Sequence, residues 1–198
     1  LKEEFFAIWD IVDTFYGAFG FTFETVRLSF HDPEKMEKYL GTEEVWKNAE
    51  AILREMAKER NVPFVEAPDE AALYGPKVDF IAKDSLGREH QVATIQLDMN
   101  LPERFDLTCI NEKGEKERIV MIHAAIMGSL ERFLAVLIEH LAGNFPLWLS
   151  PTQVRVIPVA EGQYAYAREV KDALIGAGIR AEIDESNEGL GKKVRAAK

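Results

Sequence analysis

Residues 120–133, VMIHAAIMGSLERF, place an arginine where the charge of a helix disfavours a cation. An apolar segment that ends at His123 indicates a strand, a Gly-Ser pair indicates a helix start, and Arg132 follows in the first helical turn. The N-terminus of a helix carries partial positive charge and free N–H groups, so a cation there favours an anion as partner. The pattern predicts a phosphate-binding position at Arg132. The alternative is a solvated face on which Glu131 and other acids neutralise Arg132.

Polar residues interrupt the otherwise apolar segment EHQVATIQLDM, residues 89–99. Side chains alternate between the two faces of a strand, which predicts Thr94 and Gln96 on one face and Gln91 on the other unless a bulge intervenes. Amide side chains are costly to bury without partners, so they should bond to other polar groups. An exposed strand edge would satisfy them equally well.

Two more positions could carry chemistry. Tyr74 and Lys77 flank a Gly-Pro turn, a geometry that can project side chains into a cleft, although many such turns have no further role. His123 ends its strand at the same rim of the predicted sheet. His123 could be a hydrogen-bonded core residue or a metal ligand. A metal ligand requires partner ligands, and the spacing of Cys109 and His90 from His123 does not indicate that they supply them.

The elements that position these residues form two predicted domains, residues 1–147 and 148–198. In the first, apolar periodicity predicts helices over 5–19, 42–60 and 129–141 and strands over 22–30, 76–84, 89–99, 104–110 and 117–123. Short turns between successive strands imply an antiparallel sheet with packed helices. A proline-containing linker then leads into a β-α-β-α pattern, typical of a mixed α/β domain. The predicted fold class is α+β, and we expect the second domain to be truncated because domains usually need on the order of 100 residues.

Composition limits the classes of function. The chain has 198 residues, of which 47% are apolar, enough for a substantial core. Its net charge of −10 excludes a generally basic nucleic-acid wrapper but allows a local cationic groove. The single cysteine, Cys109, cannot form an internal disulfide, which favours a cytoplasmic setting. No apolar run approaches the roughly 20 residues that span a bilayer, and Gly-rich phosphate loops, nucleophile elbows and HExxH motifs are absent.

Five segments, taken in order, span essentially the whole chain and resemble threonyl-tRNA synthetases, which are class II aminoacyl-tRNA synthetases. They are LYGPKVDF, QVATIQLDMNLPERFDL, MIHAAIMGSLERF, PLWLSPTQVRVIPV and DESNEGLGKKVR. The most specific part, TIQLDMNLPERFDL followed by GSLERF, is similar to the third class II signature motif, a strand and helix whose arginine binds ATP. The resemblance implies that Arg132 contacts the triphosphate of ATP, which Mg²⁺ accompanies.

The resemblance implies further substrate-binding residues. Tyr74 and Lys77 would lie near threonine and its adenylate. The residues lining the ATP and aminoacyl site would be Gln91, Thr94, Gln96 and Ser129. In the second domain, which resembles an anticodon-binding domain, Asn187 and Arg195 stand at positions that contact the anticodon of tRNA. An amide can read base edges and an arginine can bind phosphate or stack on a base, which fits this role.

The resemblance also implies a metal. His123 would be one of three protein ligands of a Zn²⁺ ion that binds the amino and hydroxyl groups of threonine and so discriminates against valine. The other two ligands, a cysteine and a histidine, would precede Leu1, as would the first two class II motifs. We therefore expect residues 1–198 to be a fragment that does not activate threonine alone, and the complete enzyme to be a homodimer.

Two departures from the family pattern leave an alternative open. Ala124 follows His123 where the family normally has an arginine, and Ser186 also stands where an arginine is usual. These changes, with the missing motifs, would suit a non-catalytic synthetase-like paralogue that binds RNA or a protein partner.

Overall fold

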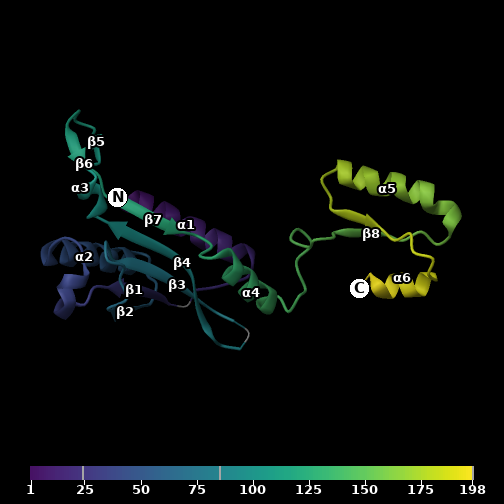
Figure 1. Ribbon diagram of the computed structural model, residues 1–198, viewed down its shortest axis with the longest axis horizontal. Coiled ribbons are helices and arrows are strands. Elements are labelled where there is room, and N and C mark those ends of the chain that lie inside the picture. The colour runs from purple at the N-terminus through teal and green to yellow at the C-terminus, as the bar shows by residue number, and fades with distance from the viewer. Residues whose placement is uncertain (24, 85, 198) are drawn as a thin grey trace. The chain divides into compact units, whose positions relative to one another are not determined.

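The computed structural model describes residues 1–23, 25–84 and 86–197 and divides into two compact units, Leu1–Ala142 and Gly143–Lys198. The first unit is built on a five-stranded sheet of order β2-β1-β3-β4-β7 (Figure 1). Its strands are β1 (Val26–Phe30), β2 (Phe64–Pro68), β3 (Lys77–Lys83), β4 (Glu89–Asp98) and β7 (Met121–Ala125). The β1–β2 pair is parallel, and the other three pairs are antiparallel.

Helices pack against one face of this sheet and form the core with it. They are α1 (Lys2–Ala18), α2 (Glu43–Glu59) and α4 (Leu130–His140). The ring of Trp9 on α1 meets Phe80 on β3 edge-on at 5.0 Å, and Phe15 meets Phe133 on α4 at 5.3 Å. The α2 helix begins as predicted, because Thr42 Oγ1 accepts a hydrogen bond from the Val45 N–H. Short helices η1 (Pro33–Lys38) and α3 (Leu101–Arg104) lie in the connections.

The other face of the sheet carries polar side chains, and we call it the polar face. Register places Lys77 opposite Gln96, Asp79 opposite Thr94, and Gln96 opposite His123. The polar face therefore comprises Arg27, Ser29, Lys77, Asp79, Thr94, Gln96, Asp98 and His123. On β1, β3 and β4 the alternate positions are apolar and buried, among them Leu28, Val78, Phe80, Ala93 and Ile95.

The α+β fold class is confirmed, but two predicted strands are placed differently. Residues 104–110 and 117–123 do not simply extend the sheet. Instead β5 (Thr108–Ile110) and β6 (Lys116–Arg118) pair with each other in a separate hairpin, and β7 returns beside β4. The hairpin projects away from the sheet (Figure 1). Its strands are largely exposed, so β5 and β6 bury little apolar surface that would favour packing against β4. Of the strand predicted over 22–30, the structure forms β1 over Val26–Phe30, and Glu24 lies outside the described residues.

The second unit has the predicted β-α-β-α order. Its elements are β8 (Val154–Val156), η2 (Glu161–Gln163), α5 (Tyr164–Gly176), β9 (Ala181–Ile183) and α6 (Leu190–Ala196). The two strands are parallel. Lys193 on α6 is buried, and its Nζ donates to the Asp184 carbonyl at 3.2 Å and lies 5.4 Å from the centre of the Tyr164 ring. Across both units, no helix in the described residues is long and apolar enough to cross a membrane.

A β-bulge interrupts β4 beside the polar face. Phe80 pairs with Ala93 but Ile81 pairs with Gln91, so Val92 is the extra residue. The hydroxyl of Tyr16, from α1, donates to the Val92 carbonyl at 2.8 Å. Burial raises the pKa of Tyr16, so this hydroxyl stays protonated and remains a donor. The bulge is thus tied to the core.

Replacing Tyr16 by Phe should destabilise the first unit by about 1–3 kcal/mol, because the buried Val92 carbonyl loses its side-chain donor. Urea denaturation of Tyr16→Phe measures the loss. Tyr166→Phe is the matched control, since Tyr166 is 70% exposed, and it should stay within about 0.5 kcal/mol of the parent chain. Equal stabilities for the two variants would show that the Tyr16 bond does not support the bulge.

Candidate functional site

Asp79 lies at the centre of the polar face and gathers side chains from three strands. Its carboxylate is 1% exposed. One oxygen, Oδ2, accepts from Ser29 Oγ and Lys77 Nζ, each at 2.7 Å, and the other, Oδ1, accepts from Gln91 Nε2 at 2.8 Å and Thr94 Oγ1 at 2.7 Å. One carboxylate, which was not among the site residues predicted from the sequence, therefore holds three residues that were: Lys77, Gln91 and Thr94. The available signal was an aspartate within an otherwise apolar strand, two residues after Lys77 and so on the same face.

The prediction that Gln91 lies on the face opposite Thr94 is wrong. Gln91 Nε2 donates to Thr94 Oγ1 at 2.8 Å as well as to Asp79. The extra residue at Val92 shifts the alternation by one position, which turns the Gln91 side chain onto the polar face. The bulge thereby adds an amide to the site.

His123 belongs to a second cluster on the same face. Its Nε2 lies 2.9 Å from Asp98 Oδ2, whose side chain is fully buried. The other oxygen of Asp98 accepts from the backbone N–H groups of Asn100 and Leu101, at the start of α3. The Tyr74 ring meets the His123 ring edge-on at 5.2 Å. His123 is therefore held in a fixed orientation on one side by a carboxylate and on the other by an aromatic ring.

The Gly-Pro turn lies flush against β4. Gln96 Nε2 donates to the Gly75 carbonyl at 2.9 Å, and Asn100 Nδ2 donates to the Tyr74 carbonyl at 2.9 Å. A Cβ added at Gly75 would stand 1.7 Å from the Leu97 carbonyl oxygen, so a side chain there would force β4 and the turn apart. Because the turn lies so close to β4, Tyr74 contacts His123 and Lys77 lies opposite Gln96.

Arg132 stands at the N-terminus of α4, as predicted. Ser129 caps the helix, its Oγ accepting from the Arg132 N–H at 3.3 Å, and the guanidinium Nη1 donates to the Gln91 carbonyl at 3.4 Å. Arg132 and Glu131 are both exposed, and among the described residues neither side chain forms an ion pair. Gly128, with φ of +61°, approaches the Val92 carbonyl so closely that a Cβ would lie 2.9 Å from it.

The arrangement around His123 fits a residue that supplies one ligand to a metal ion. The described residues contain no group of three or more His, Cys, Asp or Glu side chains that could hold an ion by themselves. A histidine that binds metal through one ring nitrogen commonly donates the other N–H to a carboxylate. The bond from His123 Nε2 to Asp98 has this form and leaves Nδ1 available.

The predicted anticodon residues lie in the second unit. Asn187 is exposed in the loop between β9 and α6, and Arg195 is exposed on α6, where its Nε donates to the Gly191 carbonyl at 3.1 Å. Ser186 stands where the resemblance described above implies an arginine, and its hydroxyl donates to Asp184 Oδ1 at 2.6 Å. It therefore closes a local turn and presents no cation.

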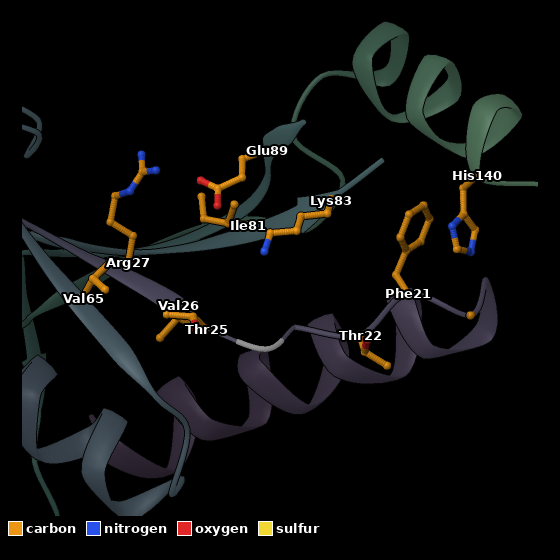
Figure 2. Close-up of a pocket in the computed structure, with 11 residues that line it drawn as sticks. Phe21, Thr22, Thr25, Val26, Arg27, Val65, Ile81, Lys83, Glu89 and His140 are labelled. Carbon is orange, nitrogen blue, oxygen red and sulfur yellow. The ribbon is translucent and has the colours of Figure 1, made fainter. Parts of the chain in front are cut away.

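A cavity of about 350 Å³ opens at the far end of β3 and β4 (Figure 2). The rings of Phe21 and His140 stack at 4.1 Å on one side of it, and Arg27 and Glu89 extend from the strands on another. None of the site residues predicted from sequence lines this cavity.

Family models match both units of the chain. The model of the tRNA synthetase class II core domain (G, H, P, S and T) matches residues 1–141. The chain belongs to the class II tRNA synthetases. The second match, to the anticodon binding domain, covers residues 153–198 of this synthetase chain.

The resemblance to threonyl-tRNA synthetases is confirmed. Threonine–tRNA ligases of Chlorobium phaeobacteroides and Deinococcus radiodurans are 51% and 48% identical over 197 residues, which is 100% of this chain and 30% of each relative. The crystal structure of the RNA binding domain of threonyl-tRNA synthetase from Cryptosporidium parvum superposes with a TM-score of 0.90 at 39% identity. That match covers 99% of this chain and 48% of the other. This synthetase chain thus spans 30% of the length of these curated relatives.

Replacing Asp98 by Asn should move the hydrogen of the neutral His123 ring from Nε2 to Nδ1. The carboxylate only accepts, whereas Asn can turn its Nδ2 donor toward the ring while its oxygen keeps the two backbone bonds. Ring ¹⁵N chemical shifts at alkaline pH report the tautomer. His140 serves as the reference in the same spectrum, because no carboxylate of residues 1–23, 25–84 or 86–197 bonds to its ring. A hydrogen that stays on Nε2 in the variant would contradict the assigned role of Asp98.

Proposed function

We propose that this chain is part of a threonine–tRNA ligase. Such an enzyme joins the carboxylate of threonine to the α-phosphorus of ATP with release of pyrophosphate, and then transfers the threonyl group to the terminal ribose of tRNA. The observation that carries the proposal is Arg132, an arginine without a described anionic partner at a helix N-terminus beside the polar face. The similarity to threonine–tRNA ligases supports the choice of amino acid.

The chemistry requires charge stabilisation and no covalent nucleophile. Negative charge builds on the phosphate oxygens as threonine attacks and pyrophosphate leaves, and fixed positive groups lower the energy of that state. Arg132 and the free N–H groups of α4 would bind the triphosphate with Mg²⁺, and Lys77 would contact the adenylate. Gln91, Thr94, Gln96, Tyr74 and Ser129 would complete the substrate-binding surface.

His123 would contribute one ligand to a Zn²⁺ ion through Nδ1, with Asp98 orienting the ring. Bound zinc would hold the amino and hydroxyl groups of threonine and so select it over valine, which lacks the hydroxyl. The remaining two ligands, a cysteine and a histidine, would come from the part of the complete enzyme outside this chain.

The second unit would bind the tRNA anticodon through Asn187 and Arg195. We place the division between the synthetase and anticodon-binding parts at residues 1–147 and 148–198. For the complete enzyme we propose a cytoplasmic homodimer.

A non-catalytic paralogue is the second candidate, and Ser186 favours it because no cation is presented at that position. Ala124 supports a non-catalytic paralogue less strongly than its position beside His123 in the sequence implies. Ala124 pairs with the buried Ile95, so it points to the face opposite His123, and an arginine there would not lie among the residues of the polar face.

In the complete enzyme, Arg132→Ala should lower kcat of threonine-dependent pyrophosphate exchange by about 10²–10³, because one preorganised charge on the triphosphate is lost. Arg168→Ala is the control: Arg168 is an exposed arginine of α5 that pairs with Glu185, and its loss should change the rate by less than about 3-fold. Residues 1–198 alone should give no exchange. Pyrophosphate exchange by residues 1–198 alone would contradict the proposal, as would an Arg132→Ala enzyme that keeps the parental rate. A complete protein without exchange activity would favour the non-catalytic paralogue.

A further inference from the structure

The carboxylate of Asp79 cannot be a ligand-binding group. Each of its oxygens already accepts two hydrogen bonds from protein side chains, which uses the roughly four lone-pair positions that a carboxylate offers. It is also almost completely shielded from solvent. Any effect of Asp79 on a ligand must therefore pass through the side chains that it holds.

Lys77 is the charged group that Asp79 holds. The ammonium donates one hydrogen bond, to Asp79 Oδ2 at 2.7 Å, and has two further donors. The Lys77 side chain is 16% exposed, so its flexible stem is largely buried and the ion pair fixes where the ammonium emerges. A lysine prepared in this way can bind an anionic oxygen without first losing the freedom of a mobile side chain.

Gln91 is held in one amide orientation. Its Nε2 carries two hydrogens, and both are used, one on Asp79 Oδ1 and one on Thr94 Oγ1. The Thr94 hydroxyl donates its own hydrogen to Asp79 Oδ1, so it can only accept from Gln91. The reverse orientation would put the amide oxygen against the carboxylate, where both groups only accept. Gln91 therefore offers its Oε1 acceptor to a ligand and has no donor to offer.

We propose that Asp79 is a positioning residue that presents Lys77 as a donor to an anionic oxygen and Gln91 as an acceptor for an N–H or O–H group of the same ligand. This inference rests on the proposed function, in which the ligand is an aminoacyl adenylate. Its phosphate supplies the anionic oxygen, and its ribose hydroxyls, purine amine and amino group supply donors. Asp79 thus selects a ligand that carries both features and disfavours one with an acceptor at the Gln91 position.

Asp79→Asn tests the proposal, since the amide has nearly the same shape but one of its two ends becomes a donor. Either Lys77 or the Gln91–Thr94 pair then faces a donor and loses its position. In the complete enzyme, kcat/KM for ATP in threonine-dependent pyrophosphate exchange should fall on the order of 100-fold, the scale expected when reacting groups are misplaced by about 1 Å.

Asp84→Asn is the matched control. Asp84 is also a buried aspartate of the same β-hairpin with a saturated carboxylate, but its partners are Leu86, Arg88 and His90, at the turn. Its replacement should lower the unfolding temperature while changing kcat/KM less than about 3-fold. If Asp79→Asn keeps parental kcat/KM, or if both variants lose activity in proportion to their unfolded fractions, the positioning role is wrong.

A readout on the isolated chain separates this inference from the proposed function. The side-chain amide resonances of Gln91 should shift in Asp79→Asn and remain unchanged in Asp84→Asn, with Gln153, which donates to the Leu147 carbonyl in the second unit, as the reference. Unchanged Gln91 resonances overturn the role of Asp79 whatever the activity. An inactive complete protein with shifted resonances overturns the proposed function and its adenylate ligand, while the orientation of Gln91 stands.

Discussion

The site depends on burying the carboxylate of Asp79 within the sheet. A buried charge is costly unless it is paired and fully hydrogen-bonded. The donors come from β1, β3 and β4, so the bonds form only if these strands keep their order and register. The bulge at Val92 is part of the same constraint, because it alone turns Gln91 toward the carboxylate. Packing on the helix face and polar bonding on the other face therefore specify one arrangement.

Much of this architecture could be predicted from local sequence. The start of α2 at Thr42 and the start of α4 at Ser129 follow from N-cap preference and helical periodicity, which depend on residues a few positions apart. The exceptional position of Arg132 could also be recognised, since the macrodipole of its helix is a local property. Whether Glu131 neutralised that charge could not be decided from the sequence, because side-chain pairing depends on how the helix faces its surroundings.

The remaining features depend on contacts between distant segments. The side of Gln91 could not be predicted because the bulge is stabilised by Tyr16, a residue of α1 that is 76 positions away from Val92 in the chain. Asp79 and Asp98 were missed for a related reason: a single acidic residue in an apolar strand gains meaning only when its donors are known. Those donors come from other strands and turns, which the sequence pattern does not bring together.

The most direct test of the central claim is a crystal structure of the complete enzyme with a non-hydrolysable threonyl-adenylate analogue. We expect the analogue to lie across the polar face, with its phosphate-mimicking group near Lys77 and one of its N–H or O–H groups donating to Gln91 Oε1. An analogue bound in the cavity beside His140, or elsewhere with Lys77 and Gln91 untouched, would contradict it.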